Sequence, residues 1–157
     1  MGRSQILRIP MRSHIISYLK TLYGPEEPIS FPKKSDYNAF LVKKLGLPPR
    51  DFRLDCSNMK KIAIQPPETN LKDLFANNYL GFHDQIAFRR IVERDFISDF
   101  HAFVNQKITE GWNRKMGTIM FMELNNIVDD ELSYSAFYRD FNRLLFKRRS
   151  TFSKSEY

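Results

Sequence analysis

The sequence predicts a mostly α-helical protein, an α-rich α+β fold built as a helical bundle with at most a small β element. Apolar residues recur at three- and four-residue spacing along much of the chain, which is the pattern of amphipathic helices. Short apolar runs of strand type occur in two places, residues 5–9 and 59–65. With 42% apolar and 14% aromatic residues, the 157-residue chain has enough core-forming side chains to fold as one domain.

The domain is predicted to have two parts that pack together. An N-terminal α/β part spans residues 1–65, and a C-terminal helical part spans residues 66–157, with the boundary at the proline-led segment 66–70. The runs 5–9 and 59–65 are expected to pair as a small two-stranded sheet. Pro10 is expected to end the first strand.

Two helices are expected in the N-terminal part. The first spans residues 12–23 and ends at Gly24-Pro25. Its apolar face is predicted to consist of Ile15, Ile16, Leu19, Leu22 and Tyr23. An extended segment follows over residues 26–32, because residues before proline avoid the helical region. The second helix spans residues 36–45, capped by Ser35 or Asp36. Its predicted inward side chains are Tyr37, Phe40, Leu41 and Leu45.

Three helices are expected in the C-terminal part, over residues 82–110, 114–125 and 134–149. A stripe along the first consists of Ile86, Ile91, Val92, Phe96, Phe100, Phe103, Val104 and Ile108. Gly111 is the predicted stop of that helix. Ser133 is the predicted N-cap of the last helix, and residues 129–131, which are all acidic, favour the positive end of its dipole.

The charge is unevenly distributed along the chain. The net charge is +7 and the pI about 9.6. Residues 1–64 carry 12 basic and 5 acidic side chains, residues 65–131 carry 7 and 11, and residues 132–157 carry 6 and 2. Basic ends therefore flank an acidic middle, a pattern that either marks a surface for a polyanion or is ordinary solvated surface.

No enzyme chemistry is predicted, and neither a cofactor nor a metal is expected. The six glycines are scattered singly, so there is no phosphate-binding loop. His14, His83 and His101 have no second His or Cys at metal-ligand spacing. The acidic pair Asp95 and Asp99, four residues apart, could hold a divalent ion in a nuclease, or be a solvated stripe on the helix.

The sequence favours a soluble cytoplasmic protein with no membrane partner. Cys56 is the one cysteine, so no internal disulfide can form. Arg8, Arg12 and His14 interrupt the N-terminal apolar residues, which excludes a signal peptide of the usual pattern. No window approaches the roughly 20 apolar residues that span a bilayer.

The last three predicted helices have the spacing of a helix-turn-helix unit, in which the final helix enters the major groove of double-stranded DNA. The candidate DNA-binding residues for phosphates are Arg139, Arg143, Lys147, Arg148 and Arg149. Those for base edges are Ser135, Tyr138 and Asn142, and those for the flanking backbone are Arg114 and Lys115. Lys33, Lys34, Lys43 and Lys44 would extend the basic surface. The alternative is a solvated face or a protein-contacting surface.

Five segments carry a resemblance to a group of proteins. Residues 113–122, 125–127 and 134–139, with residues 11–19 and 23–25, resemble parts of small uncharacterised proteins from phages and mobile elements of Bacteroidota-type bacteria. The resemblance implies a mobile-element setting, in the host cytoplasm if phage-encoded, and a regulatory role. It carries no catalytic residues.

The function expected from the sequence is a DNA-binding accessory or regulatory protein of a phage or mobile element. Such binders often act as homodimers on symmetric half-sites. The alternative is a non-enzymatic adaptor or inhibitor that docks on a host protein, since the chain is rich in Phe, Tyr and Met, residue types that are enriched at interfaces.

Overall fold

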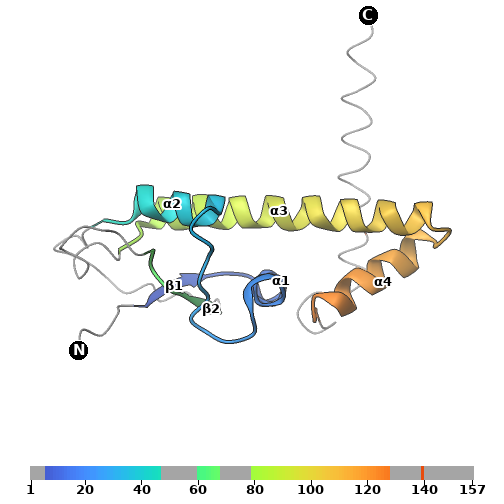
Figure 1. The fold of residues 1–157 in the computed structure, drawn as a ribbon, viewed down its shortest axis with the longest axis horizontal. Coiled ribbons are helices and arrows are strands. Elements are labelled where there is room, and N and C mark those ends of the chain that lie inside the picture. Colours follow the sequence, from blue (N-terminus) through green and yellow to red (C-terminus); the bar gives the residue numbers. More distant parts are fainter. Residues whose placement is uncertain (1–5, 47–59, 68–78, 128–138, 140–157) are drawn as a thin grey trace, which may run out of the picture. The chain divides into compact units, whose positions relative to one another are not determined.

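The computed structural model describes residues 6–46, 60–67, 79–127 and 139. Within them the chain is mostly helical with a small two-stranded sheet (Figure 1), which confirms the α-rich fold with a small β element. The elements are β1 (Leu7–Pro10), α1 (Ser13–Tyr23), α2 (Asp36–Lys44), β2 (Lys61–Ile64), α3 (Phe82–Thr109) and α4 (Arg114–Leu124). Arg139 is helical, and the rest of the helix predicted over residues 134–149, its Ser133 cap and the acidic residues 129–131 lie outside the described residues.

The chain forms two compact units, which we call unit 1 (Met1–Ile97) and unit 2 (Ser98–Tyr157). The division falls inside α3, so the first half of this helix belongs to unit 1 and the second half to unit 2. The predicted parts, residues 1–65 and 66–157, divide the chain elsewhere. Within unit 1, residues from both predicted parts share one core, as the contacts of Phe88 with Phe31 and Tyr37 show.

The sheet is antiparallel, and its register places four buried apolar side chains on one face. Leu7 lies opposite Ile64 and Ile9 opposite Ile62, and all four side chains are buried. Because side chains alternate along a strand, Arg8 and Lys61 belong to the other face, where both are exposed. The other edge of β2 bonds the segment before α2, since the Ile29 amide donates to the Ala63 carbonyl at 2.9 Å.

The first strand ends at Pro10, as the sequence predicted, although Pro10 itself belongs to the strand. Pro10 is the last residue of β1 and pairs with Lys61. Proline lacks an amide hydrogen but is tolerated at an edge strand, and β1 is an edge of this sheet. The next amide, that of Met11, donates to the Lys60 carbonyl at 2.9 Å, so pairing continues past the proline.

Local capping chemistry sets the ends of the helices in unit 1. The Ser35 hydroxyl accepts from the Asn38 amide at 3.1 Å and caps α2. Gly24 ends α1 with φ of 112°, a left-handed backbone that glycine adopts without steric cost. The predicted helix limits are therefore confirmed to within one residue.

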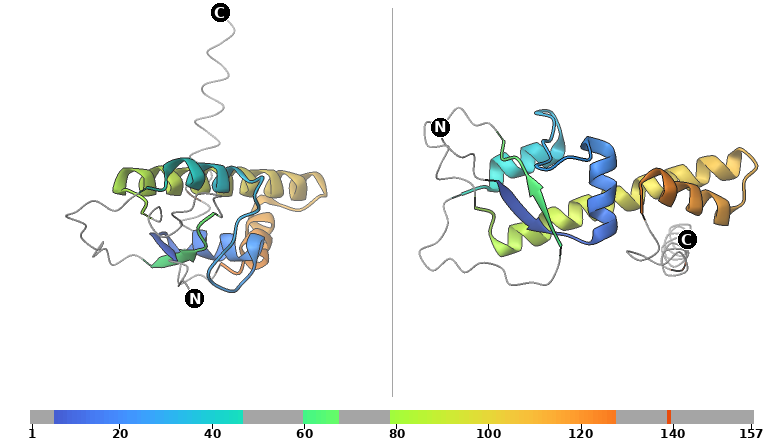
Figure 2. Two further views of the ribbon diagram at one scale, coloured as in Figure 1. Left: turned by 60° about the vertical axis from the view of Figure 1, so that its left-hand side comes forward. Right: turned by 90° about the horizontal axis from the view of Figure 1, so that it is seen from below.

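Helix α2 lies alongside the first half of α3, and α1 crosses α3 (Figure 2). The two side-chain contacts at the ends of α2 show that it runs antiparallel to α3: Tyr37 Oη donates to Asp95 Oδ2 at 2.8 Å, and Lys44 pairs with Asp84 at 3.7 Å. Arg12, just before α1, pairs with Glu93 at 3.7 Å. Both helices are thereby tied to one segment of α3.

Aromatic rings fill the core of unit 1 around Phe88. This side chain is fully buried, and its ring lies 6.1 Å from Phe31, 5.8 Å from Tyr37 and 5.7 Å from Phe40, measured between centroids. On the α1 side, Phe96 contacts Tyr18 edge-on at 5.1 Å. Such tilted and edge-to-face pairs are the favourable arrangements of aromatic rings.

The predicted apolar stripes of α1 and α3 differ at several residues from the side chains that are buried. Leu22 of α1 and Ile108 of α3 are exposed, although the spacing placed them inside. Phe88, His14 and Tyr18 are buried, although the predicted stripes omitted them. Helical spacing fixes which residues share a face, but the position of the neighbouring helix decides how wide the buried face is.

Unit 2 consists, in its described part, of the second half of α3, the turn after it, α4 and the residues that follow. Phe121 of α4 packs edge-on against Phe100 at 5.0 Å and in a tilted arrangement against Phe103 at 5.6 Å. Gly117 of α4 lies close to α3, where a Cβ would make ordinary van der Waals contact with Val104 Cγ1 at 3.5 Å. Helix α4 therefore lies directly against the C-terminal half of α3 (Figure 1).

Candidate nucleic-acid interface

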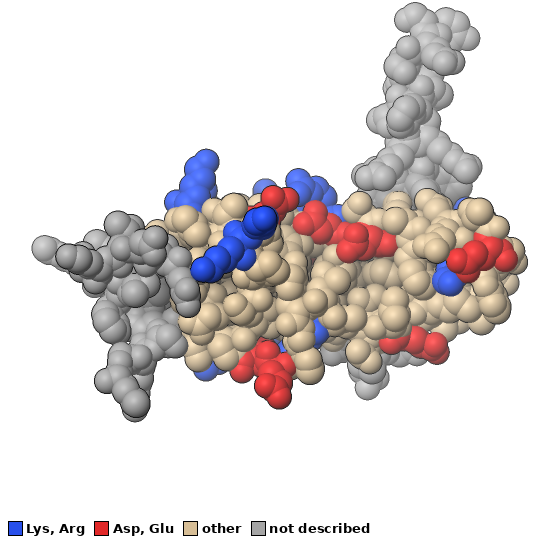
Figure 3. Space-filling model, in the orientation of Figure 1, with Lys and Arg blue, Asp and Glu red and all other residues tan. Residues whose placement is uncertain are grey.

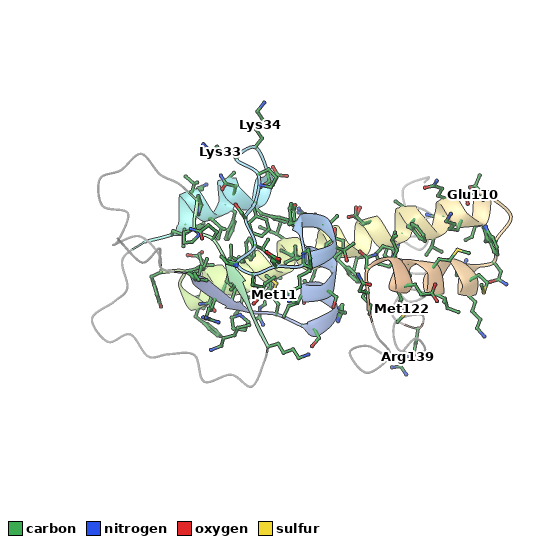
Figure 4. The ribbon with its side chains drawn as sticks, turned by 60° about the horizontal axis from the view of Figure 1, so that its bottom comes forward. Met11, Lys33, Lys34, Glu110, Met122 and Arg139 are labelled. Carbon is green, nitrogen blue, oxygen red and sulfur yellow. The ribbon has the colours of Figure 1, made fainter. Side chains whose placement is uncertain are left out.

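Three of the predicted DNA-binding residues are described, and all three belong to unit 2. Arg114 is the first residue of α4 and is half-buried, whereas Lys115 and Arg139 are exposed. Figure 4 shows Arg139 outside α4, with its side chain extending away from the ribbon. The other predicted contacts, Ser135, Tyr138, Asn142, Arg143, Lys147, Arg148 and Arg149, lie outside the described residues.

The turn that precedes α4, residues 110–113, has a backbone held by hydrogen bonds. The Gly111 amide donates to the Ile108 carbonyl and the Trp112 amide to the Lys107 carbonyl, each at 3.0 Å. Asn113 caps α4, its side-chain oxygen accepting from the Met116 amide at 2.8 Å. Gly111 has φ of 96°, which confirms it as the residue where α3 stops. The turn thus presents its side chains from an ordered backbone.

Trp112 is the most unusual side chain of this turn. It is the only tryptophan of the chain, and its side chain is 46% exposed. The neighbouring apolar residues Ile108 and Met116 are exposed as well. Large apolar side chains gathered on a surface mark contact sites more often than isolated ones do. Trp112 is not among the predicted contact residues, although a lone tryptophan directly before an Asn-Arg-Lys run is a visible signal of a contact site.

The charges around the turn leave an excess of positive charge. Lys107 Nζ donates to Glu110 Oε2 at 2.9 Å, and Glu110 lies at the end of α3 in Figure 4. This hydrogen bond from Lys107 lowers the pKa of Glu110 below its usual value, so the carboxylate is ionised and paired. Lys115 pairs with no carboxylate among the described residues. Lys115 is therefore the basic side chain of the turn region that the structure leaves without a carboxylate partner among the described residues.

Unit 1 carries a second group of basic side chains, which we call the α2 lysine group: Lys33, Lys34, Lys43 and Lys44. All four are exposed, and Figure 4 shows Lys34 pointing away from the body of the unit. On the face drawn in Figure 3, Lys and Arg side chains project over α2, with acidic side chains beside them. Helix α2 is about 14 Å long at ~1.5 Å per residue, with Lys33 and Lys34 just before its start and Lys43 and Lys44 in its last turn.

Acidic neighbours neutralise part of the basic charge of unit 1. Lys44 pairs with Asp84, and Lys20 pairs with Glu27 at 3.6 Å. Within the described ranges of the chain, no carboxylate pairs with Lys34 or Lys43. These two lysines therefore remain available to an external anion.

His14 and Asp95 have structural surroundings. His14 is buried with its ring 5.4 Å from that of Phe96, and burial, with a smaller effect of Arg12, lowers its pKa to about 4. Asp95 accepts from Tyr37, and Arg94 approaches its other oxygen at 3.4 Å. Among the residues the structure describes, no group of three or more His, Cys, Asp or Glu is arranged to hold a metal ion.

Comparison with protein-family models, with curated proteins and with solved structures finds no match for this chain. In the described part of the chain, no helix combines the length and the apolar character needed to cross a bilayer.

Proposed function

We propose that this protein binds DNA as an accessory or regulatory protein, with basic side chains of both units contacting phosphates. The observation that carries the proposal is the excess of exposed positive charge in unit 1, where the described residues include 12 Lys and Arg against 6 Asp and Glu. A protein that neutralises several phosphates releases counterions and gains affinity that does not depend on sequence.

In this proposal the C-terminal basic residues supply most of the binding energy. Arg143, Lys147, Arg148 and Arg149 contact phosphates, whereas Ser135, Tyr138 and Asn142 contact base edges. The α2 lysine group and Lys115 add contacts to the flanking backbone. We propose that this binding regulates a phage or mobile element, a setting implied by the resemblance of residues 113–122 and 134–139.

Two charge-removal variants test the proposal. Replacing Arg143, Lys147, Arg148 and Arg149 with Ala should weaken binding to a mixed-sequence duplex and reduce the slope of log affinity against log salt by about 4, one per phosphate contact. Replacing Lys33, Lys34 and Lys43 with Ala should reduce it by about 3. Fluorescence anisotropy of a labelled duplex measures both slopes.

The matched control changes exposed neutral residues on α3, Ala102→Ser with Asn105→Ala, and should leave the slope as in the wild type. Circular dichroism checks that every variant keeps its helical content. If both charge-removal variants bind the duplex as the wild type does, the proposed surface is wrong.

The second candidate function is protein binding by an adaptor or inhibitor. It is favoured by one observation, the exposure of Ile108, Trp112 and Met116 around the turn before α4. Aromatic and Met side chains are enriched at protein interfaces. An apolar interface of this kind is insensitive to salt, which distinguishes it from phosphate contact.

A further inference from the structure

We infer that the turn of residues 110–113 is a contact site for an unpaired nucleobase, with Trp112 as the stacking platform and Lys115 as the adjacent phosphate contact. The inference rests on the proposed function and makes it more specific. It adds a second class of ligand, DNA with a single-stranded segment, to the duplex contacts proposed for the basic residues.

The first argument is that Trp112 is exposed while hydrogen bonds hold its backbone in place. The Trp112 amide is bonded to the Lys107 carbonyl, and the residues on either side of Trp112 are held by the Ile108 carbonyl and by the N-cap of α4. Binding to a preordered side chain loses less conformational entropy than binding to a mobile one. The packing of Gly117 against Val104 fixes the start of α4 in the same way.

The second argument is that a basic residue, Lys115, closely follows Trp112 in the sequence. Stacking on an aromatic side chain combined with a nearby cation is the usual way in which proteins bind single strands without sequence preference. Glu110 does not oppose this, because its carboxylate is paired with Lys107. Lys115 follows three residues after Trp112, is exposed, and has no carboxylate partner in the described part of unit 2.

The same charge favours a nucleic acid over a protein as the occupant. Ile108 and Met116, each four residues from Trp112 in the sequence, are exposed and could contact the sugar or the base next to the stacked one. A purely apolar protein interface would gain nothing from Lys115. The positive charge of Lys115 therefore favours an anionic ligand, and a nucleic-acid strand supplies that charge together with a base for stacking.

Tryptophan fluorescence reports on the surroundings of Trp112 alone, because the chain contains no other tryptophan. The full-length protein is titrated with a 20-residue oligothymidine at low salt, and tryptophan fluorescence is followed. A parallel titration follows the anisotropy of the same oligonucleotide carrying a dye. Stacking should quench the fluorescence over the same concentration range in which the anisotropy rises.

Four variants complete the experiment. Trp112→Ala should weaken single-strand binding by about tenfold or more, and Trp112→Phe should retain most of the affinity because a ring remains. Lys115→Ala should weaken it less than Trp112→Ala. The matched control is Leu124→Ala, which removes an apolar side chain that is more exposed than Trp112 at the other end of α4 and should bind as the wild type.

Two results would overturn the inference in distinguishable ways. If the oligonucleotide binds by anisotropy while the tryptophan fluorescence and the affinity of Trp112→Ala are unchanged, Trp112 is not a stacking site, although the proposed DNA binding stands. If neither the oligonucleotide nor a duplex binds at low salt, both the inference and the proposed function are wrong. In that case the exposed turn becomes a candidate protein contact.

Discussion

Replacing Phe88 with Ala is expected to lower the free energy of unfolding by about 3–5 kcal/mol. Phe88 is fully buried and contacts three other rings, those of Phe31, Tyr37 and Phe40. Truncation removes the transfer free energy of the ring and leaves a cavity between α2, α3 and the segment before α2. Since domains are stable by roughly 5–15 kcal/mol, this one change would remove a large part of the total.

Urea unfolding followed by circular dichroism measures the effect. Phe88→Leu, which keeps most of the buried volume, should lose markedly less stability than Phe88→Ala. The exposed-site control Ala39→Ser on α2 should change the free energy of unfolding by about 0.5 kcal/mol or less. A loss below about 1 kcal/mol in Phe88→Ala would mean that the ring cluster does not form the core of unit 1.

The stability of the fold is expected to fall between pH 6.5 and pH 4, with His14 contributing at most about 3 kcal/mol to the loss. Burial, with a smaller effect of Arg12, lowers the pKa of His14 from 6.5 to about 4 in the folded protein. Between these values the unfolded chain binds a proton that the folded chain does not. The stabilising effect of neutral His14 is therefore fully present above pH 6.5 and is lost as the pH falls towards 4.

The free energy of unfolding measured at pH 7.0 and pH 4.5 tests this prediction in the wild type and in His14→Gln. The variant has no group that titrates at this position, so its loss of stability between the two pH values should be smaller. The exposed-site control Ala39→Ser, which removes no titratable group, should keep the pH dependence of the wild type. Equal pH dependence in His14→Gln and the wild type would show that the histidine is not held neutral by the fold.

Most helix and strand limits could be predicted from the sequence because they depend on neighbouring residues. Gly24 and Gly111 adopt the left-handed backbone that ends α1 and α3, and Ser35 caps α2. The antiparallel pairing of residues 7–10 with 61–64 confirms the small sheet expected from two short apolar runs. In contrast, the burial of Phe88 and the exposure of Leu22 depend on where α2 and α3 lie, which local pattern does not specify.

The sequence indicated the basic residues of the candidate site but not the exposure of Trp112. The basic residues stand out in composition, and Arg114 and Lys115 lie where the start of α4 was expected. The exposure of Trp112 was not predicted, although the predicted helix limits already place residue 112 between the two helices. The hydrogen bonds of the turn hold its backbone there.

The most direct test of the central claim, that this protein binds DNA through phosphate contacts, is the affinity of the wild-type protein for a mixed-sequence duplex as a function of salt. We expect the protein to bind the duplex at 50 mM salt. Its affinity should fall by about a hundredfold or more by 200 mM, which corresponds to at least about four neutralised phosphates. Absence of binding at 50 mM, or an affinity that does not change with salt, would contradict it.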